Sequence, residues 1–116
     1  MPTFTPRDKN GEPLLDAEVK YTPVIVHVLD RTYRLALHKE LGLLPAQMKK
    51  WVLSEPTTGA KVLTVTGHYR GVPCSSAGFT SREARAAALA NFDALIERLG
   101  SKAFITKVDA AILQYK

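Results

Sequence analysis

The chain has 116 residues, 46% of them hydrophobic and 23% charged, which is the size and composition of one globular domain with its own core. Its single cysteine, Cys74, excludes an internal disulfide and favours a reducing compartment, so we expect a cytoplasmic protein. No apolar run is long enough for a signal peptide or a membrane-spanning helix, so we expect neither a secreted nor an integral membrane protein.

The net charge is +5, and it is distributed unevenly along the chain. Residues 21–79 carry seven lysines and arginines against three carboxylates, and residues 101–116 carry three against one. Residues 1–20, by contrast, carry three against four. An excess of this kind fits a polyanionic partner, although simple solubility accounts for it equally well.

The first residues are marked by three prolines and a turn signal: Pro2, Pro6, Pro13 and the pair Asn10 and Gly11. Together with mixed charge, this composition predicts a loosely ordered arm over residues 1–18. The remaining residues, 19–116, are expected to form a single domain.

The run VKYTPVIVHVL, residues 19–29, is rich in β-branched side chains and predicts a strand. Pro23 places the start of this strand at a sheet edge or a bulge, because proline donates no backbone hydrogen bond. His27 lies inside the run and is interpreted as a structural histidine, since no second ligand-type residue lies nearby at a useful spacing.

Residues 31–53 fit two interpretations, and both stay open at this point. As a strand, Tyr33, Leu35 and Leu37 would form an apolar face, and the opposite face would carry Arg34 and His38. As helices, the segment would be capped by Asp30, broken at Gly42 and reopened by Pro45. In that form LHKELGLLPAQMKKWV resembles a helix-turn-helix motif, and the resemblance implies a DNA-binding protein.

From Trp51 onward the signals predict hairpins. WVLSE and KVLTVTG flank residues 56–59, a turn with proline early and glycine late. Residues 68–71 form a second turn or bulge, which leads into a short strand over residues 72–77.

A helix is predicted over residues 80–99. Thr80 and Glu83 have the spacing of a capping box, and Gly100 follows as the stop signal. Apolar residues recur at helical spacing and form one stripe: Ala84, Ala88, Phe92, Leu95, Ile96 and Leu99. Arg85 falls inside this arc, where it either extends to water or a carboxylate or faces an anion.

After Gly100 the apolar residues again follow helical spacing: Phe104, Ile105, Val108, Ala111, Ile112 and Tyr115. This spacing predicts a C-terminal helix, with a strand over residues 103–108 as the alternative. The sequence therefore predicts an α+β domain. Its antiparallel sheet of four to five strands would be packed by the 80–99 helix and followed by the C-terminal helix.

No catalytic, cofactor or metal motif stands out. Nothing near Cys74 in the sequence activates its thiol, and the three histidines lack a metal-ligand spacing. We therefore expect a protein that is not an enzyme and holds no cofactor.

The residues best suited to binding lie in the hairpin region, where cations alternate with aromatic rings. Cations of this kind contact phosphates, and the rings stack on bases or anchor a protein interface. The predicted nucleic-acid or partner-binding set is Lys49, Lys50, Trp51, Lys61, His68, Tyr69 and Arg70. The alternative places Trp51 in the core and the lysines in water.

WVLSEPTTGAKV, YRGVP and GFTSREARAAALANFDALIERLG together resemble small accessory proteins of phages and prophages. The resemblance spans about residues 51–100 and implies a compact helper protein inside a bacterial cell, without assigning a role to any residue. KKWVLSEPTTGAKV followed by GFTSREA also resembles the arm-binding domains of phage integrases, although the YRGVPCSSA segment departs from that layout.

The expected function is non-enzymatic binding of nucleic acid or a nucleoprotein complex through the basic hairpin surface. The alternative is a protein-binding inhibitor or adaptor that acts on a bacterial host protein, for example in a defence complex such as CRISPR. The oligomeric state stays open, with a homodimer as one option.

Overall fold

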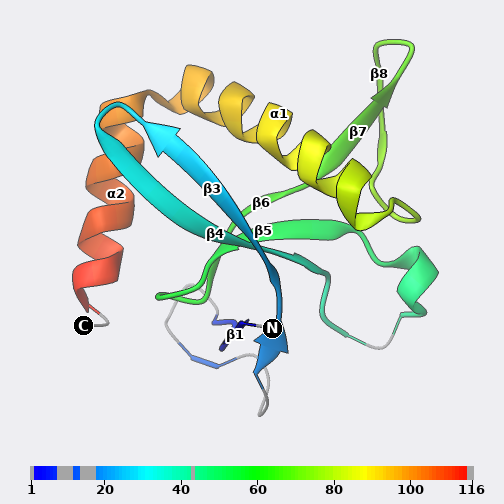
Figure 1. Cartoon of the computed structure of the whole chain (residues 1–116), viewed down its shortest axis with the longest axis horizontal. Coiled ribbons are helices and arrows are strands. Elements are labelled where there is room, and N and C mark those ends of the chain that lie inside the picture. Colours follow the sequence, from blue (N-terminus) through cyan, green and yellow to red (C-terminus); the bar gives the residue numbers. More distant parts are fainter. Residues whose placement is uncertain (1, 8–11, 14–17, 43, 115–116) are drawn as a thin grey trace.

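A computed structural model describes residues 2–7, 12–13, 18–42 and 44–114 (Figure 1). Its strands are β1 (Thr3–Phe4), β2 (Val19–Lys20), β3 (Thr22–Val28), β4 (Arg31–Lys39), β5 (Trp51–Glu55), β6 (Ala60–Thr64), β7 (Thr66–Tyr69) and β8 (Val72–Ser75). A short 3-10 helix (Ala46–Met48) precedes β5, and two α-helices close the chain, α1 (Ser81–Leu99) and α2 (Ser101–Gln114). The predicted α+β fold with a long helix and a C-terminal helix is confirmed.

The central sheet has four antiparallel strands in the order β3-β4-β5-β6, so each strand pairs with the next one in the sequence. Val28 pairs with Arg31 across a two-residue turn, and Leu37 pairs with Leu53 in the middle of the sheet. β1 with β2 and β7 with β8 form separate two-stranded ribbons.

The helix-turn-helix interpretation of residues 31–53 is wrong. Arg31–Lys39 is one strand, paired with β3 on one side and with β5 on the other. The reason is the period of two in Tyr33, Leu35 and Leu37, which places all three in the core of a strand but would spread them around a helix. Only the three residues Ala46–Met48 turn helically in the described part of this segment.

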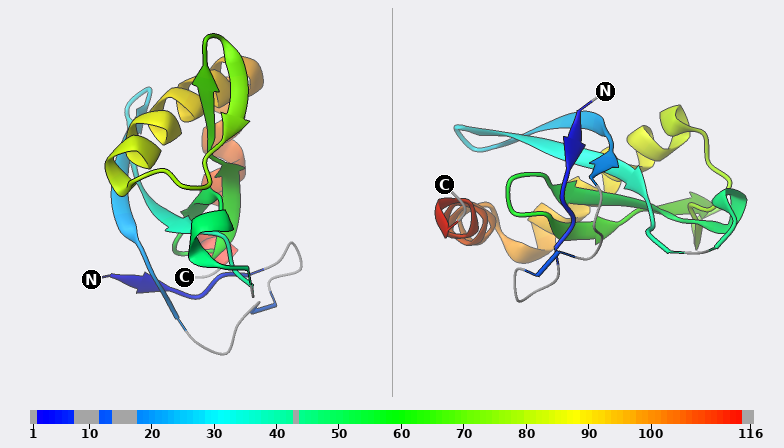
Figure 2. Two further views of the ribbon diagram at one scale, coloured as in Figure 1. Left: turned by 90° about the vertical axis from the view of Figure 1, so that its right-hand side faces the viewer. Right: turned by 90° about the horizontal axis from the view of Figure 1, so that it is seen from below.

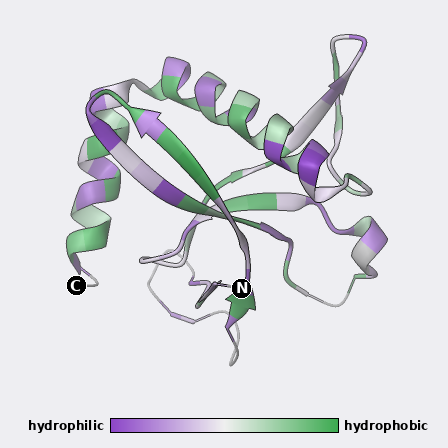
Figure 3. Cartoon of the chain, viewed as in Figure 1, coloured by the Kyte–Doolittle hydropathy of each residue, from purple (hydrophilic) through white to green (hydrophobic). Residues whose placement is uncertain are grey.

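Helix α1 lies over one face of the sheet and α2 runs along the left-hand end of its strands (Figure 1), and the core fills the space between the helices and the sheet. Its fully or nearly fully buried members are Val24, Val26, Val28, Tyr33, Leu35, Leu37, Leu53, Val65, Ala84, Ala88, Phe92 and Phe104. Colouring by hydropathy shows green and purple segments alternating along α1 (Figure 3), as expected for a helix with one buried face. Among the described residues, neither helix is long and apolar enough to cross a membrane.

Helix α1 begins with the predicted capping box. The Glu83 N–H donates to Thr80 Oγ1 at 3.2 Å, and the Thr80 N–H donates to Glu83 Oε1 at 3.0 Å. Gly100 ends the helix at a φ of 96°, in the left-handed region that favours glycine. The alanine half of the stripe packs at Ala84 and Ala88, which are fully buried.

Helix α2 is tied to the sheet through one carboxylate. Asp109 accepts a hydrogen bond from the Tyr33 hydroxyl at 3.0 Å and forms a 2.6 Å ion pair with Arg31. Phe104 lies edge-on to the rings of Tyr33 and Phe92, at centroid distances of 5.5 and 5.2 Å. The alternative strand over residues 103–108 is therefore wrong, and Tyr115 lies outside the described residues.

The N-terminal residues cross the opposite face of the sheet, as seen from below in Figure 2. The Tyr21 N–H donates to the Pro2 carbonyl at 3.1 Å, and the Arg7 N–H donates to the Gly59 carbonyl at 2.8 Å. The Phe4 ring is buried between Tyr21 and His38. Residues 2–7 of the predicted arm therefore pack on the sheet, whereas the Asn10 and Gly11 turn lies outside the described residues.

Candidate functional site

The β7–β8 ribbon projects from the body beside the first turns of α1 (Figure 1). Tyr69 pairs with Val72 across a two-residue turn formed by Arg70 and Gly71, whose φ values are 52° and 80°. Tyr69 is 68% exposed and Val72 is 63% exposed. The Arg70 guanidinium lies 5.4 Å from the centroid of the Tyr69 ring. The tip therefore presents a cation stacked on a phenol ring to solvent.

The base of the ribbon is firmly held. The Thr66 N–H donates to Asn91 Oδ1 at 2.6 Å, and Asn91 Nδ2 donates back to the Thr66 carbonyl at 3.0 Å. The next residue, Gly67, lies so close to the Phe79 ring that an added Cβ would come within 2.3 Å of it. Helix α1 and the loop before it therefore fix the direction in which the ribbon leaves the sheet.

Arg70 adopts a backbone conformation that is costly for an arginine. A non-glycine residue in the left-handed region costs roughly 1–2 kcal/mol, and asparagine and glycine occupy this turn position at lower cost. Outliers of this kind concentrate at functional sites. The strained position holds the cation at the outermost point of the ribbon.

Lys50 lies near the base of the ribbon. Its N–H donates to Glu40 Oε1 at 2.8 Å, and its carbonyl accepts the Glu40 N–H at 2.8 Å. The adjacent Trp51 N–H donates to Ser76 Oγ at 2.9 Å, which joins this strand start to the loop between β8 and α1. Lys50 is exposed, and Lys49 before it is half-buried.

Two further cations lie at the same end of the molecule, in the first two turns of α1. Arg82 and Arg85 are both exposed, and this end of the helix lies beside β7 (Figure 1). The nearby carboxylate of Glu83 is engaged in the capping box, and the hydrogen bond from the Thr80 backbone lowers its pKa. We call the group Lys50, Tyr69, Arg70, Arg82 and Arg85 the ribbon end.

Trp51 is not part of this exposed group. Its ring packs against the core, and its indole N–H donates to the Phe79 carbonyl at 3.0 Å. The Lys39 ammonium lies 5.4 Å from the ring centroid. Tyr69 is therefore the aromatic ring that the ribbon end offers for stacking.

Lys61 is separated from the ribbon tip by the extended chain. It lies on β6, eight residues before Tyr69, which corresponds to a separation of up to about 26 Å at the rise of a strand. His68 is exposed on β7, opposite Pro73. The predicted set therefore divides into His68, Tyr69 and Arg70 on the ribbon, Lys49 and Lys50 near its base, and Lys61 on another surface.

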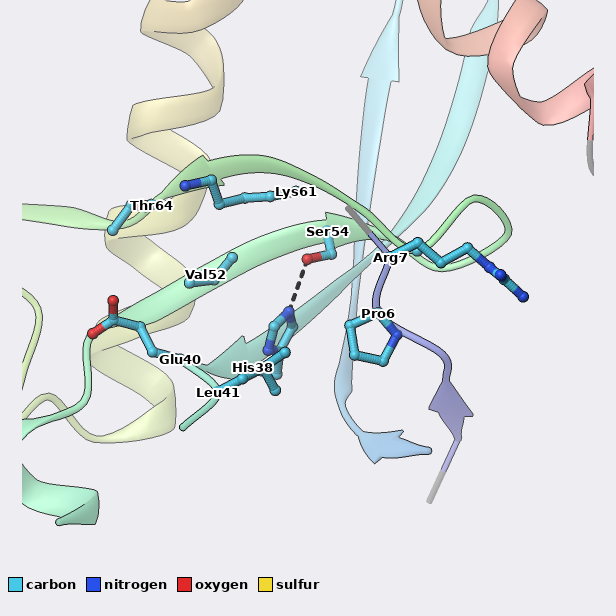
Figure 4. A pocket seen from close by; sticks show the side chains of 10 residues that line it. Pro6, Arg7, His38, Glu40, Leu41, Val52, Ser54, Lys61 and Thr64 are labelled. Atoms are coloured by element: carbon cyan, nitrogen blue, oxygen red, sulfur yellow. Dashed lines mark hydrogen bonds between the residues drawn. The ribbon is translucent and has the colours of Figure 1, made fainter. Parts of the chain in front are cut away.

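That other surface is a pocket of about 210 Å³ on the sheet face opposite α1 (Figure 4). Its lining residues come from β4, β5 and β6, from the loops after β4 and β5, and from the N-terminal segment: Pro6, Arg7, His38, Glu40, Leu41, Val52, Ser54, Gly59, Lys61 and Thr64. His38 Nε2 lies 2.8 Å from Ser54 Oγ, and His38 Nδ1 lies 2.9 Å from the Lys39 carbonyl. Because a carbonyl only accepts, Nδ1 carries the proton and Nε2 accepts from the serine.

The pairing of a serine hydroxyl with a neutral imidazole is the arrangement that activates serine nucleophiles. Here both side chains are buried, and their hydrogen bonds join β4 to β5. The alternation along β4 placed His38 with Arg34 on a polar face. The structure exposes Arg34 but buries His38, because the Phe4 ring lies over it at a centroid distance of 5.0 Å.

Burial lowers the pKa of His38 below its ordinary value of 6.5. The unfolded chain then binds a proton at this histidine more readily than the folded chain does. The contribution of His38 to the free energy of unfolding is therefore fully present above pH 6.5 and is lost as the pH decreases below that value. We expect the free energy of unfolding to decrease more for the wild type than for His38→Gln between about pH 7.5 and pH 5. Urea unfolding at both pH values measures this difference.

His27→Gln is the matched control, because His27 is exposed on β3 and contacts only Thr32 Oγ1 at 3.1 Å among its side-chain hydrogen bonds. It should keep the pH dependence of the wild type. An identical dependence in the wild type and in His38→Gln would contradict the buried, neutral assignment of His38.

No protein-family model, curated protein or solved structure matches this chain. The resemblances to phage accessory proteins and integrase arm-binding domains therefore stay predictions. Within the described residues, no three His, Cys, Asp or Glu side chains gather into a group that would hold a metal ion.

Proposed function

We propose that this protein is a small non-enzymatic binding protein that engages nucleic acid through the ribbon end. The observation that carries the proposal is the projecting β7–β8 ribbon, with Tyr69 and Arg70 exposed at its tip. Lys50 just before β5 and Arg82 and Arg85 in the first two turns of α1 add exposed positive charge at this end of the molecule. The net charge of +5 favours the same class of partner.

A two-stranded ribbon is one of the two elements that fit the major groove of a duplex, which is about 12 Å wide. Cations at its base would then meet the phosphates that flank the groove. On a single strand, the exposed Tyr69 ring offers a stacking platform that is independent of sequence. Both modes place Arg70 closest to the nucleic acid.

The strained backbone of Arg70 provides a direct test. Arg70→Asn suits the left-handed turn better, so we expect equal or higher stability together with weaker binding. Loss of this one positive charge beside the nucleic acid should lower affinity on the order of fivefold and reduce the salt slope by about 1. Fluorescence anisotropy with labelled single-stranded and duplex oligonucleotides, between about 50 and 200 mM salt, measures both quantities.

Lys102→Gln is the matched control, since it removes the same charge from an exposed position in the first turn of α2, at the far end of α1. It should leave affinity and salt slope at wild-type values. Equal losses of affinity in the two variants would show that only the net charge matters. A wild-type protein that binds neither oligonucleotide would refute the proposal.

A protein partner is the second candidate, and the composition of the ribbon tip favours it. Tyrosine and arginine are the usual anchors of protein interfaces, and Val72 adds exposed apolar surface beside them. In this case the protein acts as an inhibitor or adaptor. Its partner would be retained from a bacterial lysate at high salt and lost in Tyr69→Ala, whereas nucleic-acid binding weakens steeply with salt.

A further inference from the structure

The two edges of the central sheet differ in how they are protected. On β6, Lys61 provides an edge charge, a register irregularity interrupts the pairing at Leu53 and Ser54, and Asn91 covers the backbone of Thr66 just beyond the strand. Charges, bulges and coverings of this kind keep sheet edges from pairing with other chains. The opposite edge, β3, reads TPVIVHV and carries no Lys, Arg, Asp or Glu.

The open backbone groups of β3 follow from its register. The two-residue turn that pairs Val28 with Arg31 makes this a hydrogen-bonded pair, so Val24, Val26 and Val28 point their N–H and C=O groups toward β4. Ile25 and His27 therefore point theirs outward. Tyr21 lies an even number of residues before Ile25 and His27, so its backbone groups also point outward. Its N–H donates to the Pro2 carbonyl on that side.

The β1 strand occupies this edge only at the level of β2. Thr3 pairs with Lys20 and Phe4 pairs with Val19, and the chain then leaves the edge to reach Gly59. Beyond Tyr21, β3 is the terminal strand of its sheet, and no described helix or strand lies along its outer edge (Figure 1). The backbone of Ile25 and His27 is thus presented to solvent.

We propose that β3 pairs antiparallel with β3 of a second copy of this chain, with the two-fold axis at Val26. In this register the N–H and C=O of Ile25 meet those of His27 in the second copy, and the reverse pair repeats the contact. Four backbone hydrogen bonds form, and no like charges face each other, since the strand carries no Lys, Arg, Asp or Glu. The result is a continuous eight-stranded sheet.

The side chains support the same partner. Ile25 is 46% exposed on the face away from the helices, and pairing places it beside His27 of the second copy. A seven-residue strand from each copy makes an interface below the roughly 1,200 Å² of a standard complex. We therefore expect a weak, reversible dimer.

The pairing does not depend on the proposed function, but it would give one particle two ribbon ends. Two linked binding sites raise the apparent affinity for a long polyanion without a new contact. The dimer and the ribbon end are tested by different variants, so failure of one leaves the other standing.

The direct readout is hydrogen exchange of two amides. In a monomer the outward N–H groups of Ile25 and His27 exchange rapidly, whereas in the dimer both are protected as the protein concentration rises. Sedimentation equilibrium over about 5 to 500 µM should show the mass rising toward that of two chains in step with this protection.

Ile25→Pro removes the outward donor and adds a ring at the interface, and proline is tolerated on an edge strand where its N–H would face solvent. It should fold and stay monomeric at every concentration. Ile25→Thr is the matched control, because it keeps the backbone donor and a β-branched side chain, and it should dimerise within a few-fold of the wild type.

Rapid exchange of both amides in a wild-type protein that stays monomeric would overturn the proposal. So would an Ile25→Pro variant that dimerises as well as the wild type, since the contact would then lie elsewhere. If Ile25→Pro does not fold, the concentration dependence of the two wild-type amides still decides the question.

Discussion

Gly67→Ala is expected to destabilise the protein by about 2–3 kcal/mol and to turn the ribbon away from its present direction. A Cβ at this position would lie 2.3 Å from Phe79 Cζ and 3.0 Å from Cys74 Sγ, well inside van der Waals contact. The Phe79 ring packs against the core, so either the ring or the ribbon has to move. Urea unfolding monitored by circular dichroism measures the loss.

A double-mutant cycle identifies which contact causes the loss. Phe79→Leu removes the ring atoms nearest to Gly67, so the double variant should be more stable than the sum of the single effects predicts, by at least about 1 kcal/mol. Gly71→Ala is the control, because its Cβ would meet nothing within 4 Å and costs only backbone strain. Strictly additive losses would contradict the predicted clash.

Gly59→Ala is expected to cost about 2–4 kcal/mol, because two effects combine at this turn. Its φ of 72° is strained for alanine, and the added Cβ would lie 2.1 Å from the Thr5 carbonyl oxygen. The N-terminal segment would have to lift from the turn and break the hydrogen bond from the Arg7 N–H to the Gly59 carbonyl. Chemical unfolding measures the cost.

Gly42→Ala separates the two effects, since Gly42 also has a positive φ, 116°, but open space around its Cβ position. The free energy of unfolding of this variant should therefore decrease only by the cost of the backbone strain. Lifting the N-terminal segment in Gly59→Ala should also hydrate His38 and weaken the pH dependence of stability. Equal losses in the two glycine variants would show that the N-terminal segment does not pack tightly at this turn.

The parts of the fold that the sequence predicts are those with local signals. The capping box of Thr80 and Glu83, the glycine stop at Gly100 and the proline-to-glycine turn over residues 56–59 each act within a few residues. All three occur in the structure as expected. Residues 31–53 stayed ambiguous because helix-type boundary residues surround a segment whose apolar period is that of a strand.

The features that sequence patterns did not predict depend on contacts between distant residues. Phe4 buries His38 although 34 positions separate them, so alternation along β4 alone wrongly predicts an exposed histidine. Lys61 and Arg70 are near each other in sequence, but an extended chain carries them apart. Arg82 and Arg85 join the ribbon end because the start of α1 lies beside β7, which no local pattern reveals.

The order of strands in the sheet also bears on how the molecule assembles. Every pairing in β3-β4-β5-β6 joins consecutive strands, so contact order is low there and the meander should form rapidly, even as the polypeptide leaves the ribosome. Residues 2–7 are synthesised well before Gly59, to which the Arg7 N–H donates its hydrogen bond. During translation these residues therefore cannot pack against the turn until Gly59 has been synthesised. They should be among the last parts of the chain to become protected from proteases.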